Sequence, residues 1–333
     1  MFRSSPQSVG RRRGNLRSAL AALAALPVLL LGAAVPASAG GSGPALNTPA
    51  ATLNAALSCS ANLANATRTP VLLIHGTSST PQESWSWGYQ RALGMEGYPV
   101  CTVTLPERSG INVTVQAEYV VNAVRSMYGT SGRKIAMLGH SQGAFYPLWV
   151  LRFWPDLAAK VDDAVALAGP LDGAAAGNVL CVTGSCPEVG WQLRQGSDTI
   201  AALRRAPLPA GPAYSSIATY NDEIVFPQPS TARMPGVTTS MIQDVCPLRV
   251  VGHAGLLADA VGYALFKDAI THTGPADADR VSGLTCFAGT FDNVDLLAAP
   301  ANIFVTGAYF ALNTLTAPKV GSEPPLPAYA LNG

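Results

Sequence analysis

The chain has 333 residues, of which 48% are hydrophobic and 12% are charged, and its formal net charge is +1. This length allows one large α/β domain or two small ones, and the apolar fraction is sufficient for a large buried core. The near-neutral charge gives no electrostatic reason to expect nucleic acid or an anionic membrane surface as a partner.

The N-terminal segment has the three parts of an export signal. Residues 11–13 are all arginine, residues 19–35 are apolar with proline and glycine interruptions, and residues 37–39 read Ala-Ser-Ala, which is a typical cleavage site. A membrane anchor is the alternative, but the cleavage site and the helix breakers argue against it. We therefore expect residues 1–39 to be a signal peptide, residues 40–333 to form a single catalytic domain, and the protein to be secreted.

The first part of the mature chain alternates between apolar runs and helical patterns. Residues 40–58 are small and polar, which predicts an extended arm. The continuous apolar run at residues 71–74 is typical of a strand that is covered on both faces, and it ends in a loop of small residues. The expected elements here are a strand at 71–74, a loop at 75–80, a helix at 83–96, a strand at 100–105 and a helix at 113–128.

The central feature is a G-x-S-x-G motif between an apolar run and a helical pattern. Residues 135–138 predict a strand, Gly139 to Gly143 form the motif, and residues 144–152 predict a helix. This order is the nucleophile elbow of an α/β-hydrolase, in which the turn is so tight that only small residues fit two places before and after the serine. We therefore expect Ser141 to be a nucleophile, with the free N–H groups of the helix directed at any negative charge that develops there.

The alternation continues after Ser141 and then weakens. It predicts a mostly parallel sheet with helices on both faces, which is the α/β-hydrolase fold. After Cys286 the pattern is Ala- and Pro-rich, so residues 287–333 form a poorly defined C-terminal tail. The expected elements are strands at 161–168, 214–219 and 248–251, helices at 189–205 and 256–270, and a short mobile segment at 174–185.

A serine nucleophile needs a base, and the base needs a carboxylate that holds its tautomer. In this fold the chain order is Ser, then Asp or Glu, then His. His253 follows an expected strand in a glycine-containing loop, whereas His272, the other late histidine, lies beyond a helix. Asp222 also follows an expected strand, and its rival Asp244 lies on the entry to the strand before His253. We expect Ser141, Asp222 and His253 to form the triad.

Two backbone N–H groups are expected to bind the oxyanion. One belongs to Gln142, which directly follows the nucleophile, and the other to Thr77, in the loop after the first strand, whose hydroxyl is a further candidate donor. Such donors act because they are fixed before the negative charge appears.

Four strings together point to a known family. They are P-V-L-L-I-H-G-T at 70–77, S-Q-G at 141–143, D-E-I-V-x-P-Q at 222–228 and H-A-G at 253–255. With them the chain resembles the α/β-hydrolase lipases of the Candida antarctica lipase B family, and looks like a bacterial member, over about residues 59–286. The resemblance implies the same triad and the same two oxyanion residues.

The chain departs from that family beside the nucleophile. His140 stands where the yeast lipase has tryptophan, so we expect it to shape the substrate-binding pocket and to change its selectivity. The C-terminal disulfide of that family has no counterpart here. His75 stands where the family has proline, and its expected role is that of a loop or pocket-wall residue.

Six cysteines in an exported chain predict three disulfides. Cys181 and Cys186 enclose only four residues and are natural partners, while the residues alone leave the other pairings open. Zinc is the competing interpretation, but no C-x-x-C pair or His-rich cluster supports it. The resemblance implies pairing of Cys59 with Cys101 and of Cys246 with Cys286, which leaves Cys181 with Cys186.

These features predict a secreted lipase or esterase that works through an acyl-enzyme, with triacylglycerol lipase as the specific expectation. An acyltransferase or polyester hydrolase with the same triad is one alternative, and a non-catalytic secreted binding protein on a hydrolase scaffold is another. We expect no metal and no organic cofactor. The expected partner is a lipid or ester substrate, with transient contact at a lipid–water interface, no stable membrane insertion, no nucleic acid, and a monomeric protein.

Overall fold

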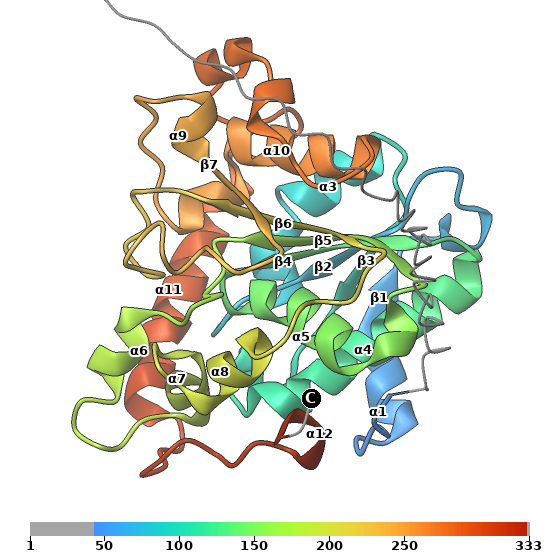
Figure 1. Cartoon of the computed structure of the whole chain (residues 1–333). Helices are drawn as coiled ribbons and strands as arrows, with labels where there is room; N and C mark the ends of the chain where they lie inside the picture. Colours follow the sequence, from blue (N-terminus) through green and yellow to red (C-terminus); the bar gives the residue numbers. More distant parts are fainter. Residues whose placement is uncertain (1–42, 332–333) are drawn as a thin grey trace, which may run out of the picture. The chain divides into compact units, whose positions relative to one another are not determined.

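A seven-stranded sheet with the strand order β1-β3-β2-β4-β5-β6-β7 forms the centre of this computed structural model (Figure 1). The structure describes residues 43–331, so the expected signal peptide lies outside the described residues. All neighbouring strands are parallel except β1 and β3, which confirms the predicted mostly parallel sheet. The strands are β1 (Leu57–Cys59), β2 (Val71–Ile74), β3 (Val100–Val103), β4 (Ile135–His140), β5 (Val161–Leu167), β6 (Ala213–Ala218) and β7 (Thr238–Met241).

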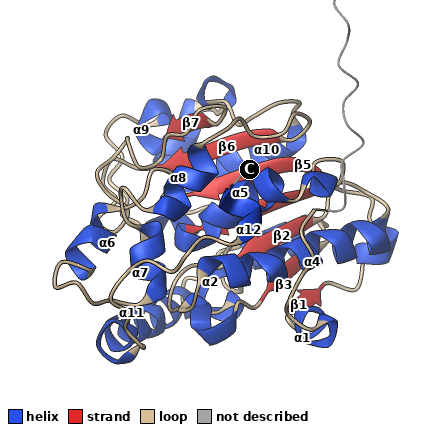
Figure 2. Cartoon of the chain, turned by 60° about the horizontal axis from the view of Figure 1, so that its bottom comes forward, coloured by secondary structure: helices blue, strands red, loops and turns tan. Residues whose placement is uncertain are grey.

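Helices cover both faces of the sheet (Figures 1 and 2). Leu72 and Ile74 belong to a core that also contains residues of α4, α5 and α8, whereas Val71 and Leu73 belong to a second core with residues of α3 and α10. Both faces of β2 are therefore buried, which explains its unbroken apolar run. The helices are α1 (Ala50–Ala55), α2 (Pro81–Trp85), α3 (Tyr89–Met95), α4 (Val113–Ser131), α5 (Phe145–Phe153), α6 (Ala175–Leu180), α7 (Glu188–Leu193), α8 (Asp198–Arg204), α9 (Ile242–Val245), α10 (Ala260–Thr271), α11 (Ala298–Thr316) and α12 (Ala328–Leu331).

Two of the predicted helices are each divided in two. The helix expected at 83–96 consists of α2 and α3, and non-helical backbone at Gly88 separates them. The helix expected at 189–205 consists of α7 and α8, and Gly196 between them has a φ of +77°. The positive φ at Gly196 is favourable for glycine and interrupts a helix, and the backbone at Gly88, with φ −121° and ψ −110°, is also non-helical. A continuous apolar pattern therefore overestimated both lengths.

The strand predicted at residues 248–251 is absent, and the last strand of the sheet is β7 instead. Leu248 is 95% exposed and Val250 is 83% exposed, so their apolar side chains do not mark a buried strand. The sequence did not reveal β7, because only Ser240 and Met241 of its four residues are buried and the strand therefore lacks an apolar run. The prediction that His253 directly follows a strand is therefore wrong, and His253 lies in a loop.

Both ends of the described chain contain more structure than the sequence predicted. The expected extended arm, residues 40–58, contains α1, which buries Leu53, and the start of β1. The expected tail, residues 287–333, contains α11 and α12, and the expected mobile segment at 174–185 contains α6. Among the described helices, none combines the length and the apolar character needed to cross a bilayer.

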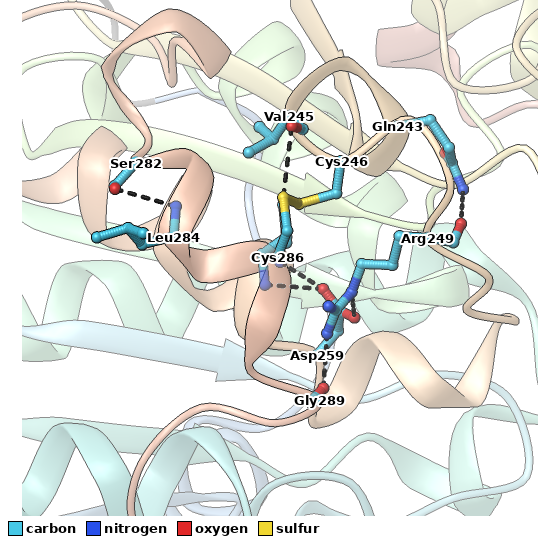
Figure 3. Close-up of a disulfide and its surroundings, with 11 residues drawn as sticks. Gln243, Val245, Cys246, Arg249, Asp259, Ser282, Leu284, Cys286 and Gly289 are labelled. Carbon is cyan, nitrogen blue, oxygen red and sulfur yellow. Dashed lines mark hydrogen bonds and ion pairs between the residues drawn. A yellow bond between two sulfur atoms is a disulfide. The ribbon is translucent and has the colours of Figure 1, made fainter.

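Three disulfides link segments around the sheet: Cys59–Cys101, Cys181–Cys186 and Cys246–Cys286. This is the pairing that the resemblance implies. The first joins β1 to β3, the second closes the loop between α6 and α7, and the third ties the end of α9 to the segment that follows α10 (Figure 3).

Candidate active site

The predicted elbow geometry is present at the end of β4. Ser141 has a φ of +58°, which is a strained conformation for a residue with a side chain. A Cβ atom at Gly139 would lie 2.0 Å from the carbonyl oxygen of Gly143, and one at Gly143 would lie 2.2 Å from the carbonyl oxygen of Ile74. Both glycines are therefore required by close backbone approach, and the turn holds Ser141 partly exposed at the carboxyl end of the parallel strands.

Asp222 and His253 form a buried pair. The Nδ1 atom of His253 lies 3.0 Å and 2.9 Å from the two carboxylate oxygens of Asp222, and the two residues are 7% and 5% exposed. Backbone N–H groups of Ile224 and Val225 donate to Oδ1 of Asp222, at 3.0 Å and 2.7 Å. These bonds fix the carboxylate, and the carboxylate in turn fixes the orientation of the imidazole.

The two rival residues lie elsewhere. Asp244 accepts a hydrogen bond of 2.7 Å from the backbone N–H of Met241 at the start of α9. His272 follows α10 with its side chain 54% exposed, and it pairs with Asp268. Each side chain thus has a local structural partner outside the site.

The loop after β2 contacts the elbow directly. A Cβ atom at Gly76 would lie 2.9 Å from Cβ of Ser141, so glycine allows the loop to approach Ser141. The Thr77 hydroxyl donates a 2.5 Å hydrogen bond to Oε1 of Gln142, whose Nε2 donates to the hydroxyl of Tyr146 at 2.7 Å. The two predicted oxyanion residues are therefore in contact with each other beside Ser141.

His75 has a structural role in this loop. Its Nε2 accepts a 3.0 Å hydrogen bond from the backbone N–H of Leu105, which leaves the ring proton on Nδ1, where it can be donated to the carbonyl oxygen of Gly76 at 3.0 Å. Burial lowers the pKa of His75 to about 4, so the ring is neutral at pH 7. It connects the ends of β2 and β3 and does not line the cavity.

An apolar cavity of about 380 Å³ opens next to Ser141. Thr77 and Gln142 line it together with Ser141, and Val225 lines it after the Asp222 turn. The facing wall is formed by small and apolar residues of α6 and α7, and α11 contributes Phe310. The lining fits an acyl chain or another apolar group better than a charged one.

The Cys181–Cys186 disulfide lies behind this wall. A Cβ atom at Gly190, a cavity-lining residue of α7, would lie 3.3 Å from Sγ of Cys186 and 3.4 Å from Sγ of Cys181. Cys186 also pairs through its backbone with Val320, in the segment after α11. The disulfide and the C-terminal segment therefore fix the wall from outside.

His140 does not line the cavity, contrary to the expectation that it shapes the substrate pocket. The residue is 5% exposed, its ring packs against that of His253 with centroids 4.7 Å apart, and its Nε2 lies 3.1 Å from the carbonyl oxygen of His253. The physical reason is local packing: the ring contacts those of His253 and Trp85 and lies within hydrogen-bond distance of the His253 carbonyl, so it is held in the interior.

Two further interactions were missed by the sequence reasoning. Glu223 lines the cavity, and its Oε2 accepts a 3.0 Å hydrogen bond from the backbone N–H of His253. In α11, Asn313 donates to the hydroxyl of Ser78 at 3.0 Å, which ties the C-terminal helix to the loop that contains Thr77. The D-E pair in the sequence could have indicated the first interaction, but no sequence signal pointed to the second.

Across residues 43–331, no group of three or more His, Cys, Asp or Glu side chains is arranged to hold a metal ion.

Comparison with known proteins gives two kinds of similarity. The model of the alpha/beta hydrolase family matches residues 71–312. Lipase B of Pseudozyma antarctica is 31% identical over 320 residues, which cover 87% of both chains. The crystal structure of Aspergillus fumigatus lipase B superposes with a TM-score of 0.77 at 24% identity, covering 87% of this chain and 74% of that one, and it supports the fold.

Proposed function

The chain belongs to the alpha/beta hydrolase family, and from that premise we propose that it is a secreted lipase or esterase that hydrolyses lipid-like carboxylic esters with Ser141 as nucleophile. The observation that carries this proposal is the position of Ser141. It stands on a strained turn beside an apolar cavity, at the same edge of the sheet as the buried Asp222–His253 pair. The similarity to lipase B of Pseudozyma antarctica supports the same activity class.

In the proposed reaction, Ser141 Oγ attacks the ester carbonyl while Nε2 of His253 accepts its proton. The geometry favours this tautomer, because Nδ1 faces the Asp222 carboxylate and keeps its own proton there. The backbone N–H groups of Thr77 and Gln142 stabilise the oxyanion, and the Thr77 hydroxyl can turn from the Gln142 side chain toward it. His253 then protonates the leaving alcohol, and water attacks the acyl-enzyme by the reverse route.

The surface around the cavity supports a lipid-like substrate, and triacylglycerol is the specific candidate. The helix α11 lines the cavity and contains no charged residue over Ala298–Thr316. Phe304 is 76% exposed and Leu315 is 75% exposed, so this helix presents apolar side chains to the solvent. We infer that the protein is a monomer that makes transient contact with a lipid–water interface, and that it is a bacterial protein. Its three disulfides favour an oxidising, extracellular location.

A serine-directed fluorophosphonate and a series of p-nitrophenyl esters of increasing chain length test the proposal. The wild-type protein should be labelled and should hydrolyse the esters, whereas Ser141→Ala should lose both properties. His253→Ala should lose hydrolysis, Asp222→Asn should slow it by about 10⁴-fold, and His272→Ala is the matched control that should stay active. An unlabelled wild-type protein, or an inactive His272→Ala beside an active His253→Ala, would contradict the proposed site.

A further inference from the structure

The proposed catalytic base lies outside regular secondary structure. Residues 246–253 follow α9 without entering the sheet, so no strand ladder binds the backbone N–H and C=O groups of His253. Buried backbone polar groups nevertheless need partners, and an unsupported loop would position an imidazole poorly. The partners of these two groups therefore matter for the reaction.

Both groups are bound by side chains. The N–H of His253 donates to Oε2 of Glu223 at 3.0 Å, and its C=O lies 3.1 Å from Nε2 of His140. Glu223 directly follows Asp222, and His140 directly precedes Ser141. The two peptide groups of His253 are therefore hydrogen-bonded to the neighbours of Asp222 and Ser141, the other two residues of the proposed triad.

We propose that His140 and Glu223 are positioning residues that clamp the backbone of His253 from two sides and so hold its imidazole between Ser141 and Asp222. This inference rests on the proposed function, because it assigns a role relative to the proposed triad. It places neither residue in contact with the reacting atoms.

The protonation state of His140 follows from its acceptor. A carbonyl oxygen can only accept, so the ring proton of His140 is on Nε2. Burial, together with the neighbouring His253, lowers the pKa of His140 to about 3, so the ring is neutral at pH 7. A neutral donor suits this position, because a permanent positive charge would oppose the imidazolium that forms on His253, 4.7 Å away between ring centroids. Trp85 also packs edge-on against the His140 ring, with centroids 6.4 Å apart.

Gly252 makes room for the second half of the clamp. A Cβ atom at this position would lie 2.6 Å from Oε2 of Glu223, which is closer than side-chain contacts allow. Glycine therefore lets the carboxylate reach the N–H of His253. Gly252→Ala should displace the carboxylate without removing it, which gives a second way to weaken the same hydrogen bond.

Paired substitutions separate the hydrogen bonds from the volume of the side chains. His140→Gln retains an Nε2 donor and Glu223→Gln retains an oxygen acceptor, whereas His140→Leu and Glu223→Leu remove them. Each leucine variant should lower kcat about 10-fold, and the double variant about 100-fold, because small misplacements of a catalytic group have effects of this size. The glutamine variants should recover most of the loss. For His140→Leu, KM should remain within about twofold of wild type, because this side chain does not line the cavity.

Two further readouts and a control variant complete the test. The rate of fluorophosphonate labelling at Ser141 should fall in parallel with kcat, since the probe reports nucleophile activation independently of acyl preference. The downfield proton resonance of the His253–Asp222 hydrogen bond should shift or broaden in the leucine variants only. Glu323→Leu is the matched control: Glu323 also accepts backbone N–H bonds, from Asp198 at 2.9 Å and Thr199 at 2.8 Å, but at α8, outside the site.

The outcomes are distinguishable. Leucine variants with wild-type kcat and labelling rate would overturn the clamp, and so would glutamine variants that are as slow as the leucine variants. If a leucine variant does not fold, Gly252→Ala and Glu223→Gln are each compared with wild type instead. A low kcat in Gly252→Ala together with a near-normal kcat in Glu223→Gln supports the clamp. A near-normal kcat in Gly252→Ala together with a low kcat in Glu223→Gln overturns it. A wild-type protein that is not labelled at Ser141 would instead contradict the proposed function.

Discussion

The Cys246–Cys286 disulfide should matter for activity as well as for stability, because it anchors the loop that leads to His253 (Figure 3). The structure supplies a matched comparison. Cys246 and Cys286 are separated by 40 positions in sequence, and Cys59 and Cys101 by 42. In the chain-entropy model, each closure stabilises the folded state by about 4 kcal/mol. For a chain of this size, that loss corresponds to a decrease in Tm of about 7 °C.

We therefore expect the two double serine variants to lose similar amounts of stability but to differ in turnover. Cys59–Cys101 joins paired residues of β1 and β3, and the strand ladder remains when the disulfide is removed. The loop at 246–253 has no ladder and would retain isolated contacts, such as the 2.9 Å hydrogen bond from the N–H of Arg249 to the C=O of Cys246 and the Arg249–Asp259 ion pair at 2.5 Å. Cys246→Ser with Cys286→Ser should accordingly lower kcat, while Cys59→Ser with Cys101→Ser should leave it near wild type.

The assay is thermal unfolding of both variants and ester hydrolysis well below the lower Tm, with a thiol count on the unreduced wild-type protein. Equal kcat values in the two variants would refute the role given to the anchor. Free thiols at Cys246 and Cys286 in the wild type would refute the pairing itself.

Other predictions concern the cavity wall, the access to the site and the dependence on pH. Cys181 and Cys186 are separated by only 5 positions, so Cys181→Ser with Cys186→Ser should lower the free energy of unfolding by only about 2 kcal/mol. Turnover of short-chain esters should be unchanged, but the ratio of long-chain to short-chain rates should change. An unchanged ratio would contradict a role of the disulfide in the cavity wall. Ser141 is already partly exposed, and α6 in the cavity wall has only six residues, so little apolar surface covers the site. The hydrolysis rate should therefore rise only modestly when a short-chain ester passes its solubility limit. A sharp rise would contradict this expectation. His75 and His140, with pKa values lowered to about 4 and 3 mainly by burial, take up protons on unfolding below about pH 6.5, so acidification from pH 7 to 5 should destabilise the fold. Asp163, whose pKa is raised to about 7 mainly by burial, opposes this effect by binding a proton in the folded state, so Asp163→Asn should make the loss of Tm with acidification steeper than in wild type.

The sequence predicted the tight turn around Ser141 because close packing leaves a clear sequence pattern there. Gly139 and Gly143 are required by backbone contacts of 2.0 Å and 2.2 Å that any Cβ would make, and the apolar run of β2 follows from burial on both faces. The contact between Gly139 and Gly143 lies within the motif, and the apolar run lies within one strand, so a local pattern reveals both. The prediction that Asp222 and His253 form a pair came from the order of the triad residues along the chain in this fold, and not from a local sequence pattern.

The parts that the sequence did not reveal depend on contacts between distant segments. The final strand β7 buries only Ser240 and Met241, so it lacks an apolar signature, whereas the exposed Leu248 and Val250 imitate one. The helix α11 buries only Ala299, and its polar contact with Ser78 spans 235 positions. His140 does not line the cavity because its ring packs against His253, which is 113 positions away in sequence.

These contacts suggest that the three parts of the proposed site are held by different means. The nucleophile is held by the sheet, since its turn is enclosed by backbone atoms of β2 and its own helix. The oxyanion loop is held by α11, both through Asn313 and through Tyr309, whose ring lies 3.6 Å from the Arg108 guanidinium that also pairs with Glu83. The base is held by a disulfide and by side chains on a loop. Perturbations should therefore affect the parts separately: reduction of the disulfides acts first on the base, and loss of the C-terminal helix acts first on the oxyanion loop, while the elbow retains its shape in both cases.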